Sequence, residues 1–269
     1  MTRFPQIGGS LFQPGVAIAP LLFFMSSQMI DFSILLPGVP VSSERGSLGW
    51  CTVSLIRHRG RCILVDTGSH GDRSVLLEAL KSHELTPDLI DDVFVTHLHY
   101  DHFLNADLFV KAKIWVPERD LAYVTEGEHR RCCDPYVPAA QVHYLADRLT
   151  PYVPDQIIAQ DLRVIGMPGH TPGTCGLFYE SSRLLFAGDG VKNGSEFLYK
   201  LPPPAFFDLE SAVANYRKIT ELGVDIVVPG HDSPFRITPD GGVRYLQTYT
   251  AAVRVFSESN PNGKLIRME

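Results

Sequence analysis

Three histidines and an aspartate lie within six residues of one another, in the stretch His97-Leu98-His99-Tyr100-Asp101-His102. The apolar run Val93-Phe94-Val95 shortly before it is typical of a buried strand. Histidines two residues apart point the same way on an extended backbone, and an aspartate is a good cap for a helix or turn that follows. Imidazole and carboxylate together favour zinc or iron. The stretch therefore predicts a metal site at the end of a strand.

Other apolar runs in the chain end in the same way, at a turn of small residues that holds one polar group. These turns hold Asp66, His170, Asp189 and His231. A single Asp-Gly or Pro-Gly-His turn is ordinary turn chemistry, but this many in one chain indicates a common site. If the strands share a direction in the sheet, their polar ends meet at one edge. The candidate metal ligands are then His97, His99, Asp101, His102, His170, Asp189 and His231.

Seven ligands are more than one tetrahedral zinc ion takes, and they suit two adjacent metals that each keep room for water. The predicted cofactor is a pair of zinc ions, with iron, manganese or cobalt as alternatives. The predicted partition is His97, His99 and His170 on the first metal, Asp101, His102 and His231 on the second, and Asp189 between them.

Two metals at this spacing would act on a shared water molecule. Metal charge lowers the pKa of bound water toward neutrality, so a bridging hydroxide would be the nucleophile. Asp101 would orient this hydroxide and accept its proton. Asp101 and Asp189 are therefore the predicted catalytic carboxylates.

The elements that must position these residues form two similar halves. The first half has predicted strands at 32–36, 51–56, 62–65, 93–95 and 112–116 and a helix at 72–83. The second half has predicted strands at 156–160, 162–165, 175–179, 184–187 and 226–228 and a helix at 208–222. Beyond it, residues 242–256 are expected to be helical and residues 260–269 to be a frayed end. The order favours two β-rich halves flanked by helices over a run of βαβ units.

The motifs resemble those of the metallo-β-lactamase-fold hydrolase superfamily. The resemblance rests on His-x-His-x-Asp-His at 97–102, Pro-Gly-His-Thr-Pro-Gly around His170, Ala-Gly-Asp at Asp189 and Pro-Gly-His at His231, and covers roughly residues 30 to 235. It implies an α/β fold, a four-layer αββα sandwich of two mixed sheets flanked by helices, with two metals at one edge. Asp66, in Leu-Val-Asp-Thr-Gly, matches the aspartate that hydrogen-bonds a metal-bound histidine in this family.

Within the superfamily, length and motif spacing are most similar to N-acyl-homoserine-lactone lactonases. This resemblance implies cleavage of a carboxylic ester, lactone or thioester. Those lactonases carry a tyrosine shortly after the bridging aspartate, whereas this chain continues Gly190-Val191-Lys192. Lys192 and Tyr199 are therefore candidate substrate contacts, as are His70 and Tyr100. The polar, turn-rich segment 125–138 is predicted to be a lid.

Three other functions remain open at this point. Two metals also suit phosphodiester or phosphotriester hydrolysis, including nuclease activity, which a basic rim of Arg130, Arg131 or Lys192 would favour. An iron-dependent dioxygenase of the same fold usually has one metal, which would leave His102 and His231 unexplained. A metal-stabilised binding protein without turnover is the third, and the complete ligand set argues against it.

Composition narrows the partners and the location. The 269 residues are 45% hydrophobic and carry a net charge of −6, so the basic footprint of a nucleic-acid binder is missing and a small-molecule substrate is expected. Five cysteines without a Cys-x-x-Cys pair predict a reducing, cytoplasmic setting. Residues 29–269 are predicted to be one domain. Residues 1–28 form an apolar extension that is too short to span a bilayer, and we expect it to pack on a partner subunit, as in a homodimer, or over the site.

Overall fold

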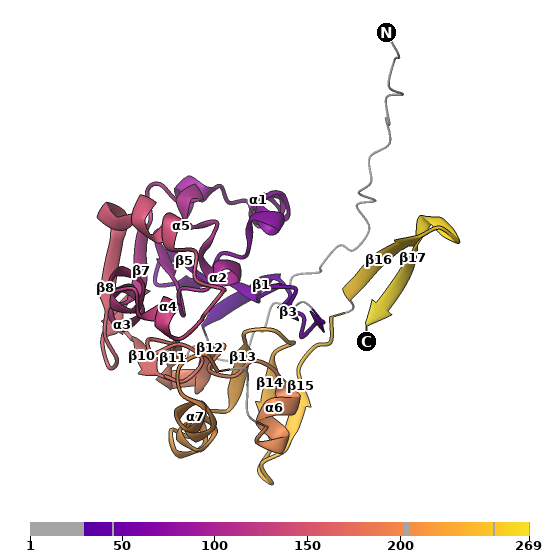
Figure 1. Ribbon diagram of the computed structural model, residues 1–269. Coiled ribbons are helices and arrows are strands. Elements are labelled where there is room, and N and C mark those ends of the chain that lie inside the picture. Colours follow the sequence, from indigo (N-terminus) through magenta and orange to yellow (C-terminus); the bar gives the residue numbers. More distant parts are fainter. Residues whose placement is uncertain (1–29, 45, 202–204, 250, 269) are drawn as a thin grey trace.

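Two β-sheets packed face to face form the centre of the structure (Figure 1). The structure is a computed structural model that describes residues 30–44, 46–201, 205–249 and 251–268. The first sheet has six strands in the order β1 (Asp31–Leu36), β4 (Val53–His58), β5 (Arg61–Val65), β6 (Asp92–Phe94), β7 (Lys113–Pro117) and β8 (Leu149–Tyr152). The strands from β5 to β8 are parallel and the others antiparallel, so this sheet is mixed.

The second sheet has seven strands and is also mixed. Their order is β15 (Val243–Tyr245), β14 (Phe235–Ile237), β13 (Ile226–Pro229), β12 (Leu184–Gly188), β11 (Cys175–Tyr179), β10 (Leu162–Gly166) and β9 (Ile157–Ile158). Only β12 and β13 run parallel. A small hairpin of β2 (Ser42–Ser43) and β3 (Gly46–Ser47) stands beside the sheets.

Alternating side chains along the central strands account for four layers. On β5, Ile63 and Val65 enter the apolar cluster between the sheets, whereas Leu64 joins the cluster beneath the first helical layer. On β12, Phe186 faces the other sheet and Leu185 faces the second helical layer. Strands apolar on both faces are what a sheet covered on both sides requires. The predicted αββα sandwich is confirmed.

Helices cover the outer face of each sheet (Figure 1). The first layer contains α1 (Arg73–Ser82), α2 (Tyr100–Phe103), α3 (Glu118–Thr125), α4 (Glu128–Arg131) and α5 (Ala139–Tyr144). The second contains α6 (Gly194–Tyr199) and α7 (Leu209–Glu221). The carboxylate of Asp208 accepts hydrogen bonds from the backbone N–H groups of Glu210 and Ser211, which explains why α7 begins there. In the described part of the chain, no helix has the length and apolarity needed to cross a membrane.

The C-terminal segment from residue 242 onward differs from the secondary structure predicted for it. The helix predicted at 242–256 is wrong, because this stretch forms β15 and then β16 (Ala251–Ser257). The frayed end predicted at 260–269 is also wrong, because β17 (Asn260–Met268) pairs with β16 in an antiparallel hairpin. The β-branched residues Val253 and Val255 alternate along β16, and pairing with β17 stabilises this extended backbone. The predicted extension 1–28 lies outside the described residues, and the single domain over 29–269 stays a prediction.

Candidate metal centre

The ends of strands from both sheets deliver the seven candidate ligands to one place. β6 ends at Phe94, and the chain runs through His97 and His99 into α2, which carries Asp101 and His102. In the second sheet, His170 follows β10, Asp189 follows β12 and His231 follows β13. All seven side chains are buried. The site therefore lies where the two sheets meet at one edge, as the sequence pattern predicts.

The ligand atoms form three overlapping groups, in each of which they lie within 4.8 Å of one another. The groups are His97, His99 and His170; Asp101, His102 and His231; and His97, His102 and Asp189.

The two oxygens of Asp189 face different histidines. Oδ2 lies 3.2 Å from Nε2 of His170, whereas Oδ1 lies 3.2 Å from Nε2 of His231 and 3.4 Å from Nε2 of His102. One carboxylate thus reaches from His170 of the first group to His102 and His231 of the second, as a bridging ligand would. Gly230 makes this possible, because a Cβ there would lie 2.1 Å from Asp189 Oδ1.

The donor atoms fit metal ions because several of them make no hydrogen bond. Nε2 of His97, His102 and His231 and Oδ1 of Asp189 are buried and make no hydrogen bond to the described residues. Each such atom costs about 1–3 kcal/mol when it stays unpaired. Imidazole nitrogens and carboxylate oxygens are ligands for zinc, iron, manganese and cobalt. A pair of cations would satisfy all four atoms.

Electrostatics also favours cations in this centre. Burial alone would lower the pKa of His102, but Asp66, Asp101 and Asp189 raise that pKa well above its usual value. Burial alone would raise the pKa of Asp189, but the charges of His231, Lys192 and His102 hold that pKa well below its usual value. The carboxylates around His102 therefore favour a positive charge at that position, and the cationic groups around Asp189 keep its carboxylate ionised.

Asp66 orients the ring of His102, as its family match implies. His102 Nδ1 donates to Asp66 Oδ2 at 2.8 Å, and Thr96 donates to the same carboxylate through its N–H at 2.8 Å and its hydroxyl at 2.9 Å. His97 Nδ1 in turn lies 3.1 Å from the Thr96 hydroxyl. These bonds leave both Nε2 atoms pointing into the centre. Such partners fix the tautomer and orientation of metal-binding histidines.

Asp134 plays the same part for His99, and it has no counterpart among the residues predicted from the sequence. His99 Nε2 donates to Asp134 Oδ2 at 2.9 Å, and His99 Nδ1 lies 2.9 Å from Nε2 of His170. Burial would raise the pKa of Asp134, but the hydrogen bond and charge of His99 lower it. Asp134 belongs to the segment predicted as a lid, where an aspartate before Pro135 signals only a turn.

Asp120, on α3, is a second residue that sequence reasoning missed. Its buried carboxylate accepts bonds from the N–H of Leu98 at 2.9 Å, the hydroxyl of Thr171 at 2.9 Å and the N–H of Gly173 at 2.7 Å. It therefore ties the loop of His97 and His99 to the loop of His170. A lone aspartate in the sequence gives no sign of such long-range bonds.

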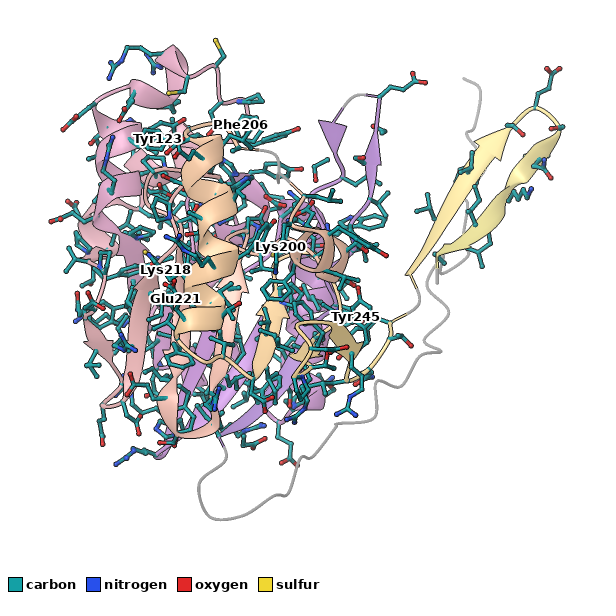
Figure 2. The ribbon with its side chains drawn as sticks, turned by 90° about the horizontal axis from the view of Figure 1, so that it is seen from below. Tyr123, Lys200, Phe206, Lys218, Glu221 and Tyr245 are labelled. Atoms are coloured by element: carbon teal, nitrogen blue, oxygen red, sulfur yellow. The ribbon has the colours of Figure 1, made fainter. Side chains whose placement is uncertain are left out.

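A cavity of about 290 Å³ opens onto the ligands. One wall is aromatic: the rings of Tyr136 and Phe206 lie 5.2 Å apart, and Phe206 lies 5.6 Å from the ring of His99. Figure 2 shows Phe206 beside the start of α7. A polar wall is formed by Lys192, Asn193 and Glu196, and the hairpin of β2 and β3 also lines the cavity.

The predicted substrate contacts divide into two groups. Tyr100 and Lys192 line the cavity, and Lys192 Nζ donates to Asp189 Oδ2 at 3.0 Å. The structure does not bring His70 and Tyr199 to this cavity. His70 is exposed on a short 3₁₀ turn, and the last turn of α6 directs Tyr199 to solvent. Arg130 and Arg131, considered for a basic rim, are not among the lining residues either.

Comparison with known proteins identifies the family. The sequence profile of the metallo-beta-lactamase superfamily matches residues 48–231, which span every candidate ligand. The chain belongs to this superfamily. It is therefore an enzyme of a metallo-hydrolase superfamily, as the motifs predicted.

Two relatives illustrate how far the similarity extends. The chain is 32% identical to "Metallo-beta-lactamase domain-containing protein 1" of Rattus norvegicus over 179 residues, which cover 65% of this chain and 63% of that protein. It is 24% identical to "Probable metallo-hydrolase MJ0296" of Methanocaldococcus jannaschii over 170 residues, 63% of this chain and 70% of that protein.

Solved structures share the fold at lower identity. One reported as a hydrolase, AbOPH, in the beta lactamase superfamily superposes with a TM-score of 0.64 at 18% identity, covering 84% of this chain and 96% of that one. AidC, described as a dizinc quorum-quenching lactonase, superposes with a TM-score of 0.60 at 18% identity, covering 74% and 80%. At such identities these likenesses concern the fold and leave the substrate open.

Proposed function

We propose that the protein is a two-metal hydrolase that opens a carboxylic ester, lactone or thioester of a small molecule. The observation that carries the proposal is the position of Asp189, whose two oxygens reach toward separate ligand groups. The fold shared with a dizinc lactonase supports it. We also propose that the metals are zinc and that the protein is located in the cytoplasm.

The proposed ligand sets follow the three groups of donor atoms. The first metal would be held by His97, His99 and His170, the second by Asp101, His102 and His231, and Asp189 would contact both. When bound, the metals would polarise the substrate carbonyl and lower the pKa of a water molecule.

The remaining side chains of the cavity would bind and orient the substrate. Burial and the nearby charge of Asp101 raise the pKa of Tyr100 to about 12, so its hydroxyl stays protonated and can donate to a substrate oxygen. Lys192 donates to Asp189 through one hydrogen and has others available for the substrate. Phe206 and Tyr136 offer an apolar surface for an acyl group.

Charge in the cavity favours a carboxylic ester over a phosphoester. Lys192 is the one cationic side chain among the described lining residues, and Glu196 lies on the same wall. Beyond the metals, this wall therefore adds only one cation, beside a carboxylate, for the negative charge of a phosphodiester. A single-iron oxygenase would leave the buried Nε2 atoms of His102 and His231 unpaired.

Metal analysis with a substrate panel tests the proposal. We expect two zinc ions per chain and turnover of lactones, aryl esters or thioesters in preference to bis-p-nitrophenyl phosphate. Asp189→Ala should lose metal and activity together, whereas Asp88→Ala, which changes an exposed carboxylate paired with Lys111, should change neither. One iron per chain with oxygen uptake, or full activity of Asp189→Ala, would reject it.

A further inference from the structure

Glu196 lies on the polar wall of the cavity, and one oxygen of its carboxylate lacks a hydrogen-bond partner. The side chain is partly buried on α6 and lines the same cavity as Asp189. Its Oε2 atom is buried and makes no hydrogen bond to the described residues. A buried acceptor in this state is costly unless another molecule supplies a donor. Because the wall faces the metal centre, the substrate is the molecule that can do so.

The polar neighbours of Glu196 do not satisfy this oxygen. Lys192 Nζ donates to Asp189 Oδ2 at 3.0 Å, and the side-chain oxygen of Asn193 accepts the backbone N–H of Glu196 at 2.9 Å. Burial and the charge of Asp189 raise the pKa of Glu196 to about 7, an increase that Lys192 and Asn193 only partly offset. The carboxyl group therefore has room for a further hydrogen bond. Rotation about its last side-chain bond is soft, so either oxygen can turn toward the cavity.

The position of Glu196 is fixed by the residue that follows it. Phe197 is buried and packs against the rings of Tyr216 and Phe235, whose centroids lie 5.8 and 5.5 Å from its own. These contacts hold α6 against the second sheet, beside β14 and β15 (Figure 1). An acceptor that is already in place needs little further ordering when a substrate binds.

The two walls of the cavity lie beside different ligand groups. Phe206 of the aromatic wall lies 5.6 Å from the ring of His99 and 5.7 Å from the ring of His170, which belong to the first proposed metal set. The polar wall adjoins the second set, since the carbonyl of Lys192 accepts the backbone N–H of His231 at 2.8 Å. An ester that spans the centre with its acyl group on Phe206 therefore directs its alcohol or thiol portion to the polar wall.

We propose that Glu196 determines specificity by accepting a hydrogen bond from an O–H or N–H group on the alcohol or thiol portion of the substrate. The inference rests on the proposed ester-opening function. It narrows the substrate to a molecule with an apolar acyl group and a leaving portion that carries a hydrogen-bond donor.

Two hexanoate esters that differ in one group test the proposal. Hydroxyethyl hexanoate offers a donor, whereas propyl hexanoate has a methyl group of similar size in its place. We expect kcat/KM of the natural protein to be about 10- to 100-fold higher for the hydroxyethyl ester, the range for a hydrogen bond to a charged group. Glu196→Ala should bring this ratio close to one, and Glu196→Gln, which keeps an acceptor oxygen, should retain part of it.

Glu221→Ala is the matched control for the ratio. Glu221 is an exposed carboxylate on α7 that pairs with Arg217 and does not line the cavity. This variant should keep the ratio of the natural protein. Because each ratio compares two substrates of the same variant, a general loss of activity cancels from it.

Binding of the corresponding amides separates this inference from the proposed function. Calorimetry gives the Kd of N-hydroxyethyl and N-propyl hexanamide whether or not the protein turns over an ester. A preference for the hydroxyethyl amide that Glu196→Ala removes, without turnover of any ester, would support the recognition by Glu196 and reject the proposed reaction. Equal values within either pair, no binding of either amide, or a preference that survives Glu196→Ala would each overturn the inference.

Discussion

Asp134 and His99 show how a single buried hydrogen bond can control a metal site. The carboxylate holds the ring of His99 so that Nδ1 faces the centre. We expect Asp134→Ala to weaken metal binding about 10- to 100-fold at the first site, because such partners orient the ligand and raise its basicity. Competition with a coloured chelator measures this loss directly.

Asp107→Ala serves as the control for that measurement. Asp107 forms a partly exposed ion pair with Arg73 and does not line the cavity. The Asp107→Ala substitution should therefore leave the metal affinity unchanged. Equal affinities of the Asp134→Ala protein and the natural protein would contradict the role assigned to this carboxylate.

Lys192 offers a prediction on catalysis rather than on metal content. Lys192→Met keeps most of the side-chain volume and removes the charge at the cavity wall. We expect kcat/KM for an ester or lactone to fall about 10- to 100-fold, the effect of losing a charged hydrogen bond of about 1.5–3 kcal/mol. Metal content should stay the same, and Lys192→Arg should recover part of the activity. Unchanged kcat/KM in the Met variant would exclude contact with the substrate.

At the scale of elements, Asp120 on α3 connects two loops that carry ligands. Removing its carboxylate leaves buried N–H groups of Leu98 and Gly173 without an acceptor. We expect Asp120→Ala to lower the free energy of unfolding by ~3 kcal/mol, since each unpaired buried donor costs ~1–3 kcal/mol. Denaturant unfolding of the metal-free protein measures it.

Asp120→Asn refines that test because the amide keeps one acceptor oxygen. Asp120→Asn should therefore lower the free energy of unfolding by less than Asp120→Ala does. Asp147→Ala changes an exposed position of a 3₁₀ turn and should hardly change the free energy of unfolding. A loss for Asp120→Ala no larger than for Asp147→Ala would show that the two loops are held by other contacts.

Local sequence predicted the elements that place the ligands, since each ligand follows an apolar run that ends in a turn. It did not predict Asp134 or Asp120, because their partners lie 35 and 22 positions away along the chain, at distances with no periodic signal. The tail was misjudged for a related reason. Alternation over Val253 and Val255 is brief, and the pairing with β17 that stabilises it comes from a separate stretch.

For the whole molecule, metal ions should act as links between the two sheets. Metals that bind the folded but not the unfolded chain add stability, about 4 kcal/mol when free metal exceeds the dissociation constant 1,000-fold. We therefore expect a chelator to lower the melting temperature and added zinc to restore it. His231→Ala should show a smaller chelator effect than the natural protein. A melting temperature indifferent to chelator would contradict this linkage.

The fold class was predictable for the whole molecule, but the hairpin at the end of the described chain was not. The Asp-Thr-Gly, His-x-His-x-Asp-His and Pro-Gly-His turns are local, and they carry the resemblance. The β16–β17 hairpin depends on pairing between two separate stretches of the chain, which no local pattern of residues expresses.

The division of ligands between two sheets has a consequence for biosynthesis. The first sheet contributes residues up to His102, and the second contributes His170, Asp189 and finally His231. Because a chain emerges from the ribosome N-terminus first, a nascent first half can hold only part of the ligand set. The pair of metals that we propose could therefore be loaded only after the second sheet has been made and has folded against the first.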